Sequence, residues 1–191
     1  MKHRLPVFAA LFAWSTALML LTQPAQAIGL DKVSLTFGME DDRGDVNSYG
    51  ISTGWDWDVK WLKTGQWYLT TYSEFGLNVW KSDQSHSNTN NTLVLVDGYV
   101  MQVLRWQRDL STTLPVFIEA GSSLNGYSHS QIDAQDFTIP FAFGTSFGAG
   151  IRFGPAREYQ VLYRFQHQSN AGLGDDNPGI QFHLISLGYR F

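Results

Sequence analysis

A histidine and a serine stand two residues apart near the end of the chain, in the run His167-Gln168-Ser169-Asn170. Residues at this spacing on a β-strand share one face, with Cα atoms about 6.5 to 7 Å apart. A serine beside a base is the minimum requirement for acyl transfer. Asn170 offers an amide donor, and the backbone N–H groups near Gly172 offer further donors to an oxyanion. The pattern therefore predicts a candidate esterase site.

The same pair also has a purely structural interpretation. Polar side chains at the rim of a membrane barrel cost little, because the penalty for polar groups fades toward the interface. The spacing of His167 and Ser169 alone therefore leaves catalysis and a rim position both open.

The elements that carry these residues are predicted to be strands. In residues 49–61 every second residue is apolar or aromatic, Thr53 excepted, while glycine, serine and charged residues fill the gaps. A period of two indicates a strand with one apolar and one polar face. Similar patterns predict eight strands, within residues 33–39, 49–61, 67–80, 93–106, 114–124, 141–153, 159–169 and 180–191.

The connections between these strands fall into two kinds. Polar loops follow strands one, three, five and seven, and turns that are mostly shorter follow strands two, four and six. This asymmetry is typical of an outer-membrane barrel. Gly and Ser crowd the polar face, as the narrow lumen of an eight-stranded barrel requires. The sequence thus predicts an all-β fold, an eight-stranded antiparallel transmembrane β-barrel, with an aromatic girdle formed by Trp55, Trp57, Trp61, Trp67 and Trp106.

The first residues are predicted to be a targeting signal rather than part of the fold. Lys2, His3 and Arg4 precede an apolar run, and the segment ends in Ala25-Gln26-Ala27. This order is typical of a secretory signal peptide cleaved after residue 27, which leaves residues 28–191 as the barrel. The 191 residues include no cysteine, which excludes disulfide scaffolds and cysteine nucleophiles. Export without cysteine favours a protein of the bacterial envelope.

Parity along residues 159–169 predicts which way the pair points. His167 and Ser169 continue the apolar series Tyr159, Val161, Tyr163 and Phe165. They are therefore expected to face lipid at the extracellular end of the strand.

These residues also carry a resemblance to a known family. The run 167–172, the Asn-Pro-Gly at 177–179 and the terminal strand ending in Phe191 resemble the PagL family of lipid A 3-O-deacylases. The resemblance implies an outer-membrane barrel of Gram-negative bacteria that hydrolyses the 3-O-linked acyl chain of lipid A (lipopolysaccharide), with no metal or other cofactor. It implies that Ser169 is the nucleophile, that His167 is the general base and then acid, and that Asn170 and backbone N–H groups near Gly172 form the oxyanion hole.

The chain departs from the family at one position. The best-known members place a Glu fourteen residues after the His, where this chain has Gln181. Gln181 shares the outward face of its strand and is expected to orient His167 through its amide oxygen, without a charge. Asp175 and Asp176 in the preceding loop are alternative acids. His183, on the same face, either contacts substrate or lies at the interface.

A non-enzymatic barrel with a structural or adhesive role is the alternative function. The net charge of −4 argues against nucleic acid as a partner. The sequence leaves open whether the barrel forms a homodimer.

Overall fold

The chain folds into one closed antiparallel sheet. The structure, a computed structural model, describes residues 29–42, 45–82, 93–133 and 135–191. The long strands are β1 (Lys32–Glu40), β2 (Val46–Asp56), β4 (Trp67–Ser82), β5 (Val94–Arg108), β6 (Val116–Tyr127), β9 (Phe141–Phe153), β10 (Tyr159–Ser169) and β11 (Ile180–Arg190). Three short strands, β3 (Trp61–Thr64), β7 (Gln131–Ile132) and β8 (Gln135–Asp136), lie outside the pattern that the sequence predicts.

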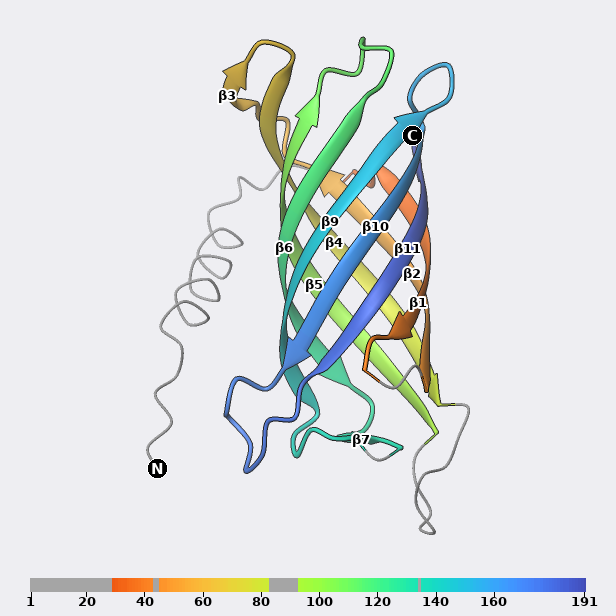
Figure 1. Ribbon diagram of the computed structural model, residues 1–191, viewed down its shortest axis with the longest axis vertical. Helices are drawn as coiled ribbons and strands as arrows, with labels where there is room; N and C mark the ends of the chain where they lie inside the picture. The colour runs from red at the N-terminus through yellow and green to blue at the C-terminus, as the bar shows by residue number, and fades with distance from the viewer. Residues whose placement is uncertain (1–28, 43–44, 83–92, 134) are drawn as a thin grey trace.

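The barrel closes by pairing its first and last strands. β1 pairs with β2 on one side and with β11 on the other, and β2 pairs with β4, so the sheet has no free edge among the eight long strands. Figure 1 shows these strands tilted around the barrel. The prediction of an eight-stranded antiparallel barrel is confirmed.

The two ends of the barrel carry different connections. At one end, the lower end in Figure 1, lie the connections β1–β2, β4–β5, β6–β9 and β10–β11, which we call the loop end. At the other, the turn end, lie the connections around β3, between β5 and β6, and between β9 and β10. The predicted signal peptide, residues 1–27, and most of the β4–β5 loop lie outside the described residues.

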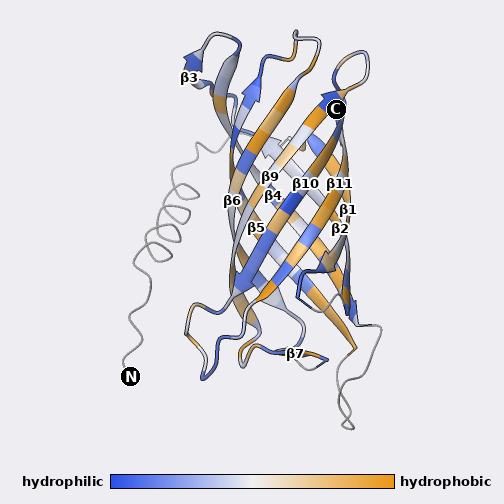
Figure 2. Cartoon of the chain, viewed as in Figure 1, coloured by the Kyte–Doolittle hydropathy of each residue, from blue (hydrophilic) through white to orange (hydrophobic). Residues whose placement is uncertain are grey.

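The wall presents its apolar residues outward. Large hydrophobic side chains such as Leu35, Ile51, Phe147 and Ile185 are exposed, while the residues between them are mostly buried. In Figure 2 hydrophobic and hydrophilic residues follow one another along the strands. An apolar outer face over a polar interior is the arrangement of a membrane-spanning barrel. No helix in the described ranges is long and apolar enough to cross a membrane.

The second strand is shorter than the sequence predicts. β2 ends at Asp56, and Trp61, expected in the same strand, begins β3, which pairs with β4. Asp56 is the last residue of β2 that pairs with β4, opposite Tyr72, and it is also bonded to Asp31 and Arg190. The five tryptophans predicted as a girdle all belong to the turn end, where Trp67 stacks on Trp106 with ring centroids 6.3 Å apart.

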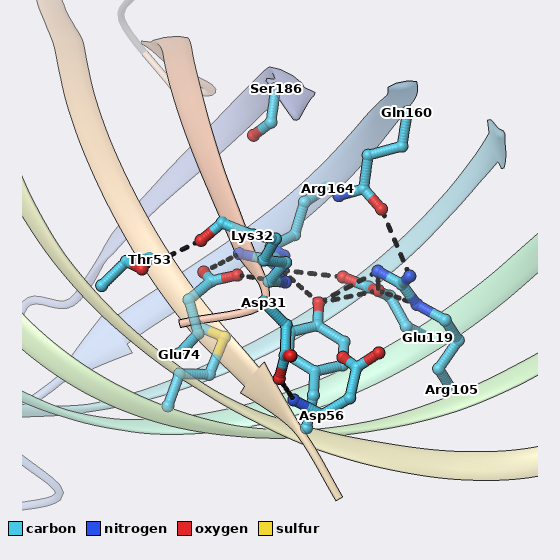
Figure 3. A network of polar contacts seen from close by, with 12 residues as sticks. Asp31, Lys32, Thr53, Asp56, Glu74, Arg105, Glu119, Gln160, Arg164 and Ser186 are labelled. Carbon is cyan, nitrogen blue, oxygen red and sulfur yellow. Dashed lines mark hydrogen bonds and ion pairs between the residues drawn. The ribbon is translucent and has the colours of Figure 1, made fainter. Parts of the chain in front are cut away.

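Charged residues fill the middle of the lumen (Figure 3). Glu119 accepts from Arg105 and from Arg164, each at 2.7 Å, and Glu74 accepts from Arg164 and from Lys32, each at 3.1 Å. All five side chains are almost fully buried. Such a network links β1, β4, β5, β6 and β10 across the barrel.

An aromatic plug closes the lumen toward the loop end. The ring of Trp80 lies 4.8 Å from that of Phe182 and 5.3 Å from that of Tyr127, centroid to centroid. Phe137, from the β6–β9 connection, completes the cluster 5.2 Å from Tyr127 and is fully buried. One loop is thereby anchored inside the barrel beneath the site.

Candidate active site

The C-terminal end of β10 places His167 and Ser169 on the outer wall of the barrel. Between them Gln168 points inward, where its Oε1 accepts a 2.6 Å hydrogen bond from the Tyr127 hydroxyl. Gln166 is likewise buried in the lumen. Because successive side chains of a strand alternate, these inward anchors turn His167 and Ser169 outward together. Both are partly exposed, as are the outward residues that precede them on β10.

The strand register brings Gln181 beside His167. His167 on β10 lies opposite Gln181 on β11 and, on its other side, opposite Thr145 on β9. Ser169 lies opposite Phe143. Within the described ranges no hydrogen bond joins the side chains of His167, Ser169 and Gln181. Catalytic hydrogen bonds of free enzymes are often made only when substrate is bound.

Asn170 is turned into the loop end rather than outward. Its Nδ2 donates to the carbonyl of Phe137 at 2.9 Å and to that of Asp176 at 2.6 Å. Its Oδ1 accepts from the N–H of Gly172 at 2.8 Å. Both predicted oxyanion donors are thus engaged inside the loop in this conformation, and their role stays a prediction.

Ala171 lies between these two residues in an unusual backbone conformation. Its φ is +54° and that of Gly172 is +79°, so two successive residues occupy the left-handed region. A side chain there is strained, and such strain is concentrated at functional sites. The N–H of Ala171 donates to no described residue, which leaves it available beside Ser169.

Gly179 ends the same loop against the imidazole of His167. A methyl group added at Gly179 would lie 2.8 Å from Cε1 of His167, and φ at Gly179 is +63°. The carbonyl of Gly179 accepts a 2.5 Å hydrogen bond from Nε2 of Gln135 in β8. The return of the loop therefore bounds the space in which the His167 ring can move.

A second histidine on the outer wall has well-defined partners that sequence reasoning missed. Nε2 of His183 lies 2.6 Å from Oδ1 of Asp41, and Nδ1 lies 2.6 Å from the Tyr163 hydroxyl. Asp41 follows β1, far from His183 in the sequence. This contact could be predicted only from the register of the β1–β11 pair that closes the barrel.

The two aspartates suggested as alternative acids lie in the exposed part of the β10–β11 loop. Asp176 uses its Oδ1 to accept the N–H of Asn177 at 2.8 Å, and Asp175 is exposed to solvent. Among the described residues no group of three or more acidic or histidine side chains is placed to hold a metal ion.

The fold and site define a class, an antiparallel membrane barrel with a serine and a histidine on the same outer face of one strand. The family model "Lipid A 3-O-deacylase (PagL)" matches residues 47–190. The chain therefore belongs to the PagL family.

Individual relatives agree over nearly the whole length. The chain is 29% identical to the lipid A deacylase PagL of Pseudomonas aeruginosa over 185 residues, 97% of this chain and 96% of that protein. It is 26% identical to PagL of Bordetella bronchiseptica over 198 residues, with 100% and 98% covered. The crystal structure of the outer membrane enzyme PagL superposes with a TM-score of 0.72 at 25% identity, covering 84% of this chain and 99% of that one.

Proposed function

We propose that this protein is a lipid A 3-O-deacylase of the Gram-negative outer membrane, with Ser169 as nucleophile and His167 as general base. The observation that carries the proposal is that the two side chains share the outward face of β10 at the loop end of a PagL-family barrel. A lipid in the outer leaflet reaches this face laterally, without entering the lumen.

The proposed reaction is a two-step acyl transfer. Ser169 Oγ attacks the ester carbonyl at the 3-position while His167 accepts the hydroxyl proton. His167 then gives that proton to the departing sugar oxygen, and an acyl-enzyme forms. Water attacks the acyl-enzyme, with His167 taking its proton, and the fatty acid leaves as Ser169 is restored. The reacting groups come from one chain, so the reaction needs no second copy.

The loop after β10 is proposed to stabilise the oxyanion. The N–H of Ala171 faces no competing acceptor among the described residues, and Asn170 and Gly172 join it when they exchange their present partners for the substrate. Preorganised N–H donors of this kind are each worth about 10²- to 10³-fold in rate.

Outward aromatic side chains line the approach to the pair. Phe165 precedes His167 on the same face, and Phe143 lies opposite Ser169, with Phe141 packed 5.1 Å from it, centroid to centroid. Their apolar surface supports the acyl chains of the substrate, and holding the ester near the nucleophile supplies much of the rate.

The test is mass spectrometry of lipid A treated with purified protein in detergent micelles. We expect the unaltered protein to remove one 3-O-linked hydroxyacyl chain and Ser169→Ala to be slower by at least about 10³-fold. Both proteins are first compared for folding by their gel mobility with and without heating.

Two results would contradict the proposal. Full activity of a folded Ser169→Ala protein would place the nucleophile elsewhere. Intact lipid A after treatment with the unaltered, folded protein would favour the alternative of a structural or adhesive barrel.

A further inference from the structure

The His167 base lacks a charged partner in its immediate neighbourhood. A base that becomes an imidazolium during acyl transfer is stabilised by an anion as well as by a group that fixes its tautomer. Gln181, opposite His167, can accept from the ring but carries no charge. The site therefore calls for a carboxylate within reach of Gln181.

The closing seam of the barrel supplies one. The N–H of Asp41 donates to the carbonyl of Gln181 at 3.0 Å, one residue beyond the last β1–β11 pair, Glu40 with Phe182. Asp41 also continues the outward parity of β1. Asp41, Gln181 and His167 thus form one row across three adjacent strands, which lie about 4.8 Å apart.

The carboxylate of Asp41 is held on the outer wall. Its Oδ1 accepts from Nε2 of His183, whose Nδ1 is bonded to the Tyr163 hydroxyl. The ring of His183 also packs against Phe165, with centroids 5.2 Å apart. Oδ2 of Asp41 accepts no hydrogen bond from any described residue, so one oxygen is anchored and the other is available.

We infer that Asp41 is the acid of this site, acting on His167 through the side-chain amide of Gln181. When substrate is bound, we expect Nε2 of Gln181 to donate to Oδ2 of Asp41 and Oε1 of Gln181 to accept from Nδ1 of His167, two hydrogen bonds that the described residues do not make in the free protein. The Gln181 amide, polarised by the Asp41 carboxylate, stabilises positive charge on the His167 ring. It also fixes the tautomer in which Nε2 of His167 is free to accept the serine proton. Asp41 is a positioning residue, and its role rests on the function proposed above.

The first test measures turnover of lipid A by Asp41→Asn. We expect kcat to fall about ten- to hundredfold, less than the 10⁴-fold known for an acid in direct contact with the base. Asp42→Asn is the matched control, because it removes the same charge from the next, exposed residue; its activity should equal that of the unaltered protein.

The second measurement is the pH profile of kcat/KM, which a merely structural role would not move. An anion near an imidazole favours its protonated form. Removing Asp41 should therefore shift the acidic limb to lower pH. On the elements next to β10, the other titratable groups are His183 on β11 and the exposed Asp175 and Asp176 of the β10–β11 loop. β9 places the uncharged Thr145 opposite His167.

The third test is rescue. Gln181→Glu places a carboxylate next to His167, so the more distant carboxylate of Asp41 is no longer needed. The double variant Asp41→Asn with Gln181→Glu should regain the turnover lost in Asp41→Asn and return the acidic limb to higher pH.

Two outcomes would overturn the inference: Asp41→Asn with unaltered kcat and pH profile, or a double variant that is not rescued. Ser169→Ala in the same assay separates the two proposals. If it is active, the proposed function fails; if it is inactive while Asp41→Asn behaves as the unaltered protein, only this inference fails.

Discussion

At the scale of single residues, Gly179 limits where the ring of His167, the proposed base, can lie. Gly179→Ala would place a methyl group 2.8 Å from Cε1 of His167 at a φ of +63°. We expect the ring to be displaced and kcat to fall about tenfold to hundredfold, as catalytic geometry is sensitive to shifts of an ångström. Turnover of lipid A measures the effect.

Gly65→Ala is the control for this substitution. Gly65 has a φ of +58° but no atom within 4 Å of the added methyl group, and it lies in the β3–β4 hairpin at the turn end. The backbone strain of Gly65→Ala should be similar to that of Gly179→Ala, about 1 to 2 kcal/mol. Gly65→Ala should leave turnover unaltered. Equal activity losses in the two variants would show that strain, rather than contact with His167, is responsible.

The sequence could predict the direction of His167 and Ser169 but not the position of Asn170. Two-residue parity determines which face a strand residue occupies, and both side chains face outward as expected. Asn170 is the first residue after β10, where parity no longer applies, and its amide is drawn inward by the carbonyls of Phe137 and Asp176. Those carbonyls belong to loops whose conformation depends on tertiary packing.

At the scale of elements, the loop between β6 and β9 supports the site through Phe137. Phe137→Ala removes a fully buried ring that packs 5.2 Å from Tyr127, and its own carbonyl anchors Asn170. We expect the free energy of unfolding to fall by about 3 to 5 kcal/mol. Urea unfolding in detergent micelles, followed by tryptophan fluorescence, measures the change.

Phe137→Leu tests the cause. It keeps most of the apolar volume and should cost less than half as much. Equal destabilisation by Leu and Ala would indicate that ring stacking, rather than filling of the plug, stabilises the loop end.

The long strands were predictable because alternation is a local property. Each of the eight segments named from the sequence overlaps one long strand of the barrel, although several ends differ, most of all at β2. β3, β7 and β8 were missed because four or fewer residues are too short to show a period. Asp41 was missed for another reason: its place beside Gln181 follows from the pairing of the first and last strands, which no local pattern encodes.

At the scale of the whole molecule, the luminal ion network joins strands from both halves of the chain. Glu119→Gln removes the counter-charge shared by Arg105 and Arg164, which leaves Arg105 without its carboxylate and Arg164 with Glu74 alone. Breaking one partner of a buried pair costs about 3 to 5 kcal/mol. The urea midpoint should fall accordingly, while lipid A turnover of the folded fraction stays the same, since the network lies away from the outer wall.

Asp58→Asn provides the comparison, because it removes a carboxylate from an exposed position at the turn end. Its midpoint should lie close to that of the unaltered protein. A midpoint for Glu119→Gln that matches it would mean that the luminal charges contribute little to the stability of the barrel.

The hydrogen bond from Asp41 to Gln181 belongs to the junction between β1 and β11. Those strands are separated by nearly the whole chain, and they meet only when the cylinder is sealed. Before β1 and β11 pair, the carboxylate of Asp41 is separated from Gln181 and His167 by the width of the unclosed sheet. On the role proposed for Asp41, deacylation therefore reaches its full rate only after the barrel has closed.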